Sequence, residues 1–287
     1  VDTGKLQDTE ELKAVESAEQ EEPEPSPGFS IADLAWQLTT NHSMSQDDIL
    51  TKLREAMPEL DPTRGSHALL SQAGERERSE SACLSVIALV SNSFEDFTKP
   101  QAEKGRLQQI QWRRLRKIVE WCQPEVTEMH TVLVLLAIRS LGKSKRITQQ
   151  LPAHARRPEQ ALAYLMKNVK NVVPSINGLS EEAQDLIFNI LEVNEVFNLA
   201  QMLQGENVAG SLLQLQGIIA DKGPEVFRFY ILFLLGFVSS LAGGNGSRFM
   251  NSNNAEAVIT GIQCLMHVLD SKPAGCYWTF FMRRAEQ

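Results

Sequence analysis

The sequence from Val226 to Ala242 reads VFRFYILFLLGFVSSLA, and fourteen uncharged residues separate Arg228 from Gly243. Pro224 precedes this run and Gly243 follows it, which is the usual placement of proline and glycine at the two ends of a helix. A helix that is apolar on all sides is either buried in a core or inserted in a membrane. Because a spanning helix takes roughly 20 residues, this run predicts a buried core helix, with membrane insertion as the alternative.

The rest of the chain is also typical of helices. Apolar residues recur every three or four positions between Pro, Gly and N-cap residues, and we see no pattern that predicts a strand. The expected helices cover residues 30–38, 45–57, 79–97, 102–122, 125–141, 158–169, 181–204, 208–220, 226–242 and 252–269. The sequence therefore predicts an all-α fold of about ten helices.

Two architectures fit this helix order. In the C-terminal half the expected helices start near residues 181, 206, 225 and 253, so a helix pair takes about 40 to 47 residues, as in HEAT and armadillo repeats. No residue pattern recurs between the pairs, so only their length favours a helical repeat. The other architecture is a compact bundle wrapped around the apolar helix at 226–242.

Charge divides the chain into unlike regions. Residues 1–28 hold nine acids and two bases, whereas residues 99–157 hold thirteen bases and four acids, within a net charge of -8. The first region buries too little apolar surface to offset the entropy of ordering it, so we expect an acidic disordered tail or linker. Residues 29–287 are expected to form a single helical domain. The opposite signs also allow the tail to cover the basic region.

Cysteine spacing indicates the compartment. Cys83, Cys122, Cys264 and Cys276 are far apart and form no CxxC pair, which is untypical of disulfide frameworks and zinc sites. Residues 1–28 also lack the apolar core of a signal peptide. We therefore expect a reducing, cytoplasmic location and no metal or other cofactor.

The strongest candidate site is a basic helix with aromatic residues. Four cations lie within five positions of each other, between two tryptophans, and a basic loop follows the next helix. A basic amphipathic helix of this kind suits an acidic protein, a nucleic acid or an anionic lipid surface. Its apolar stripe can equally face the core and leave the cations in solvent. The predicted partner-binding residues are Arg106, Trp112, Arg113, Arg114, Arg116, Lys117 and Trp121, extended by Lys143, Lys145 and Arg146 if the loop folds beside the helix.

Other motifs carry weaker signals. The glycine-rich stretch 243–248 lacks the preceding strand and the Gly-Lys-Ser/Thr of a phosphate-binding loop, so we expect a flexible connection. Cys264 and His267 supply two potential zinc ligands, fewer than a site needs. His130 has acids nearby but no nucleophile. The aromatic and basic end at 277–284 is expected to dock on the core of the chain, on a partner or at a membrane interface.

The sequence indicates a binding role, but it does not indicate a chemical reaction. We expect a non-catalytic helical adaptor or scaffold subunit that binds protein partners, with the basic residues between 104 and 157 as the contact surface for an acidic partner. The alternatives are an anionic-lipid or membrane-associated helical protein and an RNA- or DNA-binding helical repeat. No motif indicates an enzyme.

Overall fold

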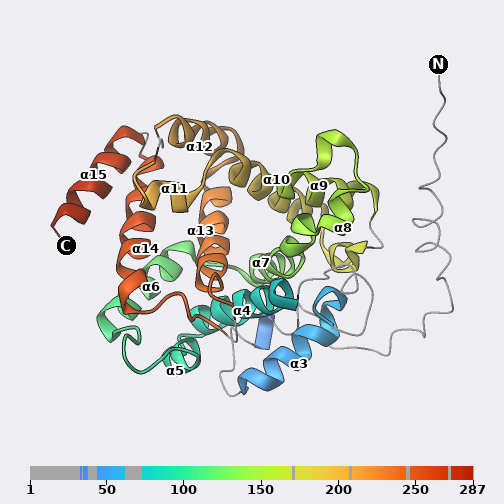
Figure 1. Cartoon of the computed structure of the whole chain (residues 1–287), viewed down its shortest axis with the longest axis horizontal. Helices are drawn as coiled ribbons and strands as arrows, with labels where there is room; N and C mark the ends of the chain where they lie inside the picture. Colours follow the sequence, from blue (N-terminus) through green and yellow to red (C-terminus); the bar gives the residue numbers. More distant parts are fainter. Residues whose placement is uncertain are drawn as a thin grey trace.

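The computed structural model describes residues 33, 35–37, 44–61, 73–169, 172–206, 209–243, 246–270 and 273–286. These residues form helices and connecting turns without a strand (Figure 1), so the predicted all-α fold is confirmed. The α-helices are α3 (Gln46–Ala56), α4 (Ala73–Val90), α5 (Phe94–Thr98), α6 (Gln109–Cys122), α7 (Val126–Ile138), α8 (Lys145–Thr148), α9 (Pro158–Asn168), α10 (Glu181–Val196), α11 (Leu199–Leu203), α12 (Ala209–Lys222), α13 (Pro224–Ser239), α14 (Ser252–Leu265) and α15 (Pro273–Ala285). Short 3-10 turns lie between them: η1 (Pro58–Leu60), η3 (Arg139–Lys143), η4 (Ala153–Ala155), η6 (Pro174–Gly178) and η7 (Met266–Val268).

Helix α13 occupies the middle of the molecule. It packs against α4, α6, α7, α10 and α12, which surround it in Figure 1. All of its large apolar side chains are buried except Phe237, which is half-buried. The expectation that this apolar helix is a core element is confirmed. The arrangement is the compact bundle, because a helical repeat would have no helix surrounded by five others.

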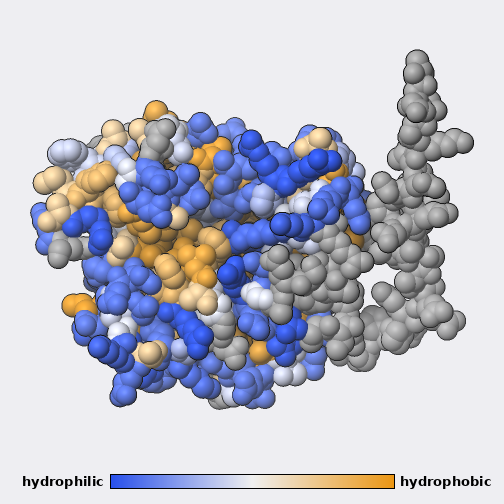
Figure 2. Space-filling view, viewed as in Figure 1, coloured by the Kyte–Doolittle hydropathy of each residue, from blue (hydrophilic) through white to orange (hydrophobic). Residues whose placement is uncertain are grey.

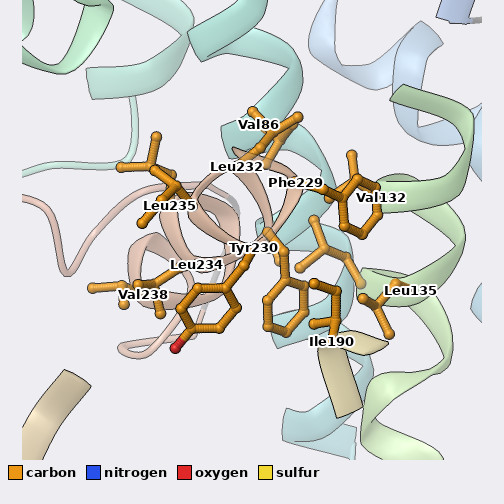
Figure 3. Packing of buried hydrophobic residues seen from close by; sticks show 14 of the residues in the cluster. Val86, Val132, Leu135, Ile190, Phe229, Tyr230, Leu232, Leu234, Leu235 and Val238 are labelled. Atoms are coloured by element: carbon orange, nitrogen blue, oxygen red, sulfur yellow. The ribbon is translucent and has the colours of Figure 1, made fainter. Parts of the chain in front are cut away.

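The tightest packing on α13 lies at Gly236. A methyl group added there would meet Val86 Cγ2 of α4 at 2.4 Å, Leu136 Cδ1 of α7 at 2.9 Å and the Ala82 carbonyl oxygen at 3.2 Å. Figure 3 shows side chains of α4, α7 and α10 converging on α13, with Val86 beside Leu232. The absence of a side chain at Gly236 therefore lets α4 and α7 approach α13 together.

Several expected helices are shorter than the apolar pattern indicates. The helix expected at 79–97 is α4 followed by α5, and Asn92 between them has the left-handed φ of 58°. The helix expected at 181–204 is interrupted at Phe197 and Asn198, where the Asn198 side chain accepts the Ala200 N–H and starts α11. The helix expected at 102–122 begins only at Gln109. In each case the apolar side chains on both sides of a break still reach the same core, so the pattern alone does not reveal the break.

The ends of the two most apolar helices also differ from expectation. Helix α13 ends at Ser239 rather than near residue 242, and the Ser239 and Ser240 hydroxyls donate to the carbonyl oxygens of Leu235 and Phe237. Helix α7 tightens into η3, where Gly142 lies so close to α9 that an added methyl group would meet the Pro158 carbonyl oxygen at 2.1 Å. This contact fixes the position of the basic residues that follow Gly142.

Two predictions involve residues that the structure does not describe. The expected acidic tail at 1–28 lies wholly outside the described residues, and so does most of the helix expected at 30–38, of which residues 33 and 35–37 are helical. Across the described ranges, every helix is too short or too polar to span a bilayer.

Replacing Gly236 with alanine should destabilise the protein. Alanine favours a helix over glycine by about 1 kcal/mol, but overpacking against Val86 and Leu136 costs about 1 to 3 kcal/mol, so we expect a net loss in the free energy of unfolding measured in urea. Gly217 in α12 is the matched control, because an added methyl group there meets no atom within 4 Å. Gly217→Ala should be neutral or stabilising. If both variants were equally stable, the close approach at Gly236 would not exist.

A buried glutamate links the N-terminal part of the bundle to η6. The Glu59 side chain, in η1, is fully buried and accepts hydrogen bonds from the backbone N–H of Ser175, at 2.9 Å, and from its hydroxyl. Burial raises the pKa of Glu59 and these hydrogen bonds lower it, with burial the larger cause. The folded protein therefore holds a proton on Glu59 at a higher pH than the unfolded chain does.

Such a shift makes stability depend on pH. The ordinary pKa of glutamate is 4.5, and between that pH and the raised pKa the folded state binds more protons than the unfolded state, so stability falls as pH rises. Relative to Glu59→Gln, the wild type should lose free energy of unfolding as the pH rises above 4.5. Urea titrations at several pH values would measure this difference, and the exposed Glu55→Gln serves as control. A difference that stays constant with pH would show that Glu59 is not perturbed.

Candidate functional site

Helix α6 carries most of the predicted contact residues and divides them between two faces. Its buried side packs against α4, α13 and α14. Its exposed face presents Ile110, with 61% of its surface accessible, together with Arg113, Lys117 and Glu120. The helix begins with reciprocal hydrogen bonds between Gln108 and Gln111 and ends at Gln123, whose φ of 46° is left-handed.

Three of the predicted cations make contacts within the protein. Arg106 pairs with Glu95 at 2.8 Å. Arg114 pairs with Glu256 of α14 and donates to Gln263 at 2.9 Å. Arg116 donates to the carbonyl oxygens of Leu89 and Val90, which are at the C-terminal end of α4, where a cation is favoured. These three side chains hold helices together and leave less charge for a partner.

The two predicted tryptophans differ in position. Trp112 is a core residue: it is 4% exposed, its ring lies 5.2 Å from that of Phe97, and its Nε1 donates to the Asn92 side chain at 3.2 Å. Trp121 is half-buried, with its ring edge against Phe227 of α13 at 6.1 Å. Only Trp121 is placed to contact a ligand on the surface.

The exposed cations of α6 are aligned with Trp121. Arg113, Lys117 and Trp121 are four residues apart, so they follow one another along one side of the helix. Trp121 borders an open groove of about 480 Å³ whose other walls are residues of α14, η7, α15 and the turn after η7: Gln263, Met266, His267, Leu269, Asp270 and Arg283. The groove therefore has a mixed lining, with Trp121, Met266 and Leu269 as its apolar residues, and the exposed cations of α6 lead to it.

The basic loop that holds Lys143 and Lys145 does not extend the surface formed by α6 and the groove. Lys143 closes η3 and Lys145 begins α8, and α8 packs on η3 and α9 rather than on α6. Figure 1 shows α6 and α8 at opposite ends of the molecule. Both lysines are exposed, and the side chain of Arg146 lies outside the description. The ten predicted residues thus belong to two separate regions.

Helix α15 docks on the core through one face and exposes the other. Cys276 and Phe280 are buried, and the Tyr277 hydroxyl donates to the Gly205 carbonyl oxygen at 3.0 Å. Trp278 is 68% exposed, with Phe281 and Met282 also at the surface. Figure 2 shows hydrophobic residues gathered over α15 and toward the middle of this face. Exposed apolar patches of this kind mark contact sites on many proteins.

In the described part of the chain, the candidate cysteines and His130 do not form a catalytic or metal-binding cluster. All four cysteines are free thiols, and burial raises the pKa of Cys122 and of Cys276 to about 12. Burial lowers the pKa of His130. Among the described residues, no three His, Cys, Asp or Glu side chains are grouped to hold a metal ion. Two residues of the glycine-rich stretch 243–248 lie outside the description.

The basic residue Arg139 was not among the predicted site residues. Arg139 follows the apolar run of α7, and its guanidinium stacks on the Phe237 ring at 3.5 Å from the centroid. The only sequence signal was an arginine directly after a run of buried residues. Its partner ring lies in α13, nearly a hundred residues along the chain, so spacing could not have identified the pair.

A family model with the description "Family of unknown function (DUF6829)" matches residues 50–273. The chain belongs to the DUF6829 family. The match begins within α3 and ends at the first residue of α15, so α6, the central α13 and the α14 side of the groove are family elements. No curated protein and no solved structure matches the chain.

Arg116 and Lys117 should differ sharply in their effect on stability. Arg116→Ala removes a donor from the carbonyl oxygens of Leu89 and Val90 at the end of α4, of which that of Leu89 also accepts from the Asn92 N–H. We therefore expect a loss of about 1 to 3 kcal/mol in the free energy of unfolding. Lys117→Ala removes an exposed side chain and should stay within about 0.5 kcal/mol of wild type. Chemical denaturation monitored by circular dichroism measures both. Equal stability of the two variants would mean that Arg116 does not cap α4.

Proposed function

We propose that this DUF6829 protein is a non-catalytic helical scaffold, or adaptor subunit, that binds an acidic amphipathic helix of a partner protein. The observation that supports this most directly is the line of Arg113, Lys117 and Trp121 leading along α6 into the groove beside α14 and α15. An amphipathic helix binds a groove of this kind through its apolar face. Acidic side chains on its flank would meet the two cations.

Apolar contacts would supply most of the binding energy. Trp121, Met266 and Leu269 line the groove, and half-buried aromatic and methionine side chains are typical anchors of protein interfaces. Ile110 extends the apolar surface along α6. Arg283 on the opposite wall provides a third cation, whereas His267 and Asp270 lie 3.7 Å apart and interact with each other.

Charge favours a protein partner over the alternatives. A nucleic acid is held mainly by many phosphate contacts, but Arg106, Arg114 and Arg116 already bind groups within the protein. An anionic lipid surface likewise draws on a cluster of cations, and the lysines of η3 and α8 are too distant to join those of α6. A reducing cytoplasmic location belongs to the same proposal and is supported by four buried free thiols.

Reversing the two exposed cations of α6 tests the proposal. Full-length protein carrying Arg113→Glu and Lys117→Glu is compared with wild type by quantitative affinity purification from native extract, at several salt concentrations and after nuclease treatment. Like charges across an interface lower affinity, and we expect acidic partners to be recovered about tenfold less. Trp121→Ala should reduce recovery at all salt concentrations, because its contribution is apolar.

A matched control separates the surface from net charge. Arg157→Glu and Lys167→Glu make the same charge change on exposed residues of the α9 region, away from α6 in Figure 1. This control should recover partners as the wild type does. Loss of the same partners from both double variants would contradict the proposal. Partners lost on nuclease treatment would support nucleic-acid binding instead, and flotation of the protein with anionic liposomes would support the lipid alternative.

A further inference from the structure

The junction of α7 and η3 holds an arginine in an unusual environment. The Arg139 guanidinium lies over the Phe237 ring at 3.5 Å from the centroid and 5.9 Å from the centroid of Phe233. Stacking of this kind orients the plane of a guanidinium but uses none of its N–H groups. Within the described residues, no carboxylate or carbonyl oxygen accepts a hydrogen bond from Arg139. Arg139 lines two small cavities.

The larger cavity has both polar and apolar walls and is partly open to solvent. It measures about 30 Å³, and its charged lining residues are Glu75, Arg78, Arg139 and Lys143, with Phe237 among the apolar ones. A second cavity of about 10 Å³ lies on the other side of Arg139 and Lys143, against Glu159 and Phe233. One water molecule needs a cavity volume of roughly 10 to 15 Å³. The larger cavity therefore admits a small group rather than a whole organic molecule.

Positive charge exceeds negative charge around the larger cavity. Glu75 is engaged by Arg78 at 2.6 Å. Lys143 has no ion pair in the part of the chain that the structure describes, and its Nζ lies 5.9 Å from the centroid of Phe237. Burial lowers the pKa of Arg139 to about 10 although Glu159 and Glu75 raise it, and burial and then Arg139 lower the pKa of Lys143. Three cations, Arg78, Arg139 and Lys143, line this cavity with one carboxylate, Glu75.

We propose that Arg139 and Lys143 bind a phosphate group in the cavity between α4, η3 and α13, with Arg78 at its edge. The planar fork of an arginine matches two oxygens of a phosphate, and a lysine adds a point charge. The stacking on Phe237 positions the Arg139 guanidinium, and the contact of Gly142 with α9 positions the backbone next to Lys143. The cavity takes the phosphate oxygens, and any organic part stays at its mouth.

This site is separate from the protein-binding groove. It lies on η3 and α13, and its lining shares no residue with the groove beside Trp121. Lys143 would then contact a small anion rather than an acidic protein. The phosphate is either the free ion or the terminal group of a phosphate monoester, and the binding experiment distinguishes the two.

Titration of full-length protein with sodium phosphate tests the inference. Calorimetry and thermal unfolding are measured with phosphate, with phenyl phosphate and with chloride at equal ionic strength. We expect saturable binding and a rise in melting temperature with phosphate beyond that with chloride. Lys143→Gln should weaken phosphate binding by about tenfold or more. Arg139→Gln should weaken it further, and Lys143→Gln keeps the test valid if Arg139→Gln fails to fold.

The control is Lys145→Gln, which removes one exposed charge two residues away without altering the cavity lining. It should bind phosphate as the wild type does. Binding of both phosphate and phenyl phosphate would indicate a phosphate monoester as ligand, and binding of phosphate alone would indicate the free ion. Stabilisation by phosphate no greater than by chloride, or equal weakening by Lys143→Gln and Lys145→Gln, would overturn the proposal.

Discussion

The contact of α13 with α4 and α7 at Gly236 determines where most other parts of the molecule lie. Because Gly236 has no side chain, Val86 and Leu136 approach the helix axis, and the Tyr230 ring meets that of Phe197 at the end of α10. Helix α6 then covers α13 from another side, with Trp121 against Phe227. The groove at Trp121 and the cavity at Arg139 are therefore both at places where α13 side chains reach the edge of the core.

Three arginines connect helices of the bundle. Arg116 binds the carbonyl oxygens that end α4, Arg114 connects α6 to α14, and Arg139 stacks on α13. Such contacts suit the guanidinium, which donates several hydrogen bonds in a plane and is less strongly hydrated than an ammonium group. The charge that remains exposed on α6 is consequently small and local. This distribution is the reason that we propose one acidic segment rather than a polyanion as the partner.

The sequence predicted the fold well because the fold depends on local signals. The uncharged run that became α13, the N-cap residues Ser45 and Ser180, and the apolar spacing of α10 all act within a few residues. Helix breaks at Asn92 and Asn198 were not predicted, because the apolar side chains on both sides of each break reach the same core and their spacing continues through it. The candidate site was predicted in part: Arg113 and Lys117 are exposed, but Arg114 pairs with a residue 142 positions away. No pattern in one sequence reveals such a partner, and the same holds for Arg139 and Phe237.

The claim on which the account depends is that the protein itself shields α13 on every side. Native-state hydrogen exchange followed by mass spectrometry tests this most directly, because amides in the innermost element open only with global unfolding. The account predicts that peptides of α13 exchange most slowly and at the rate of global unfolding, while those of α15 exchange earlier. Exchange of α13 as fast as that of α15, in the free protein, would contradict it.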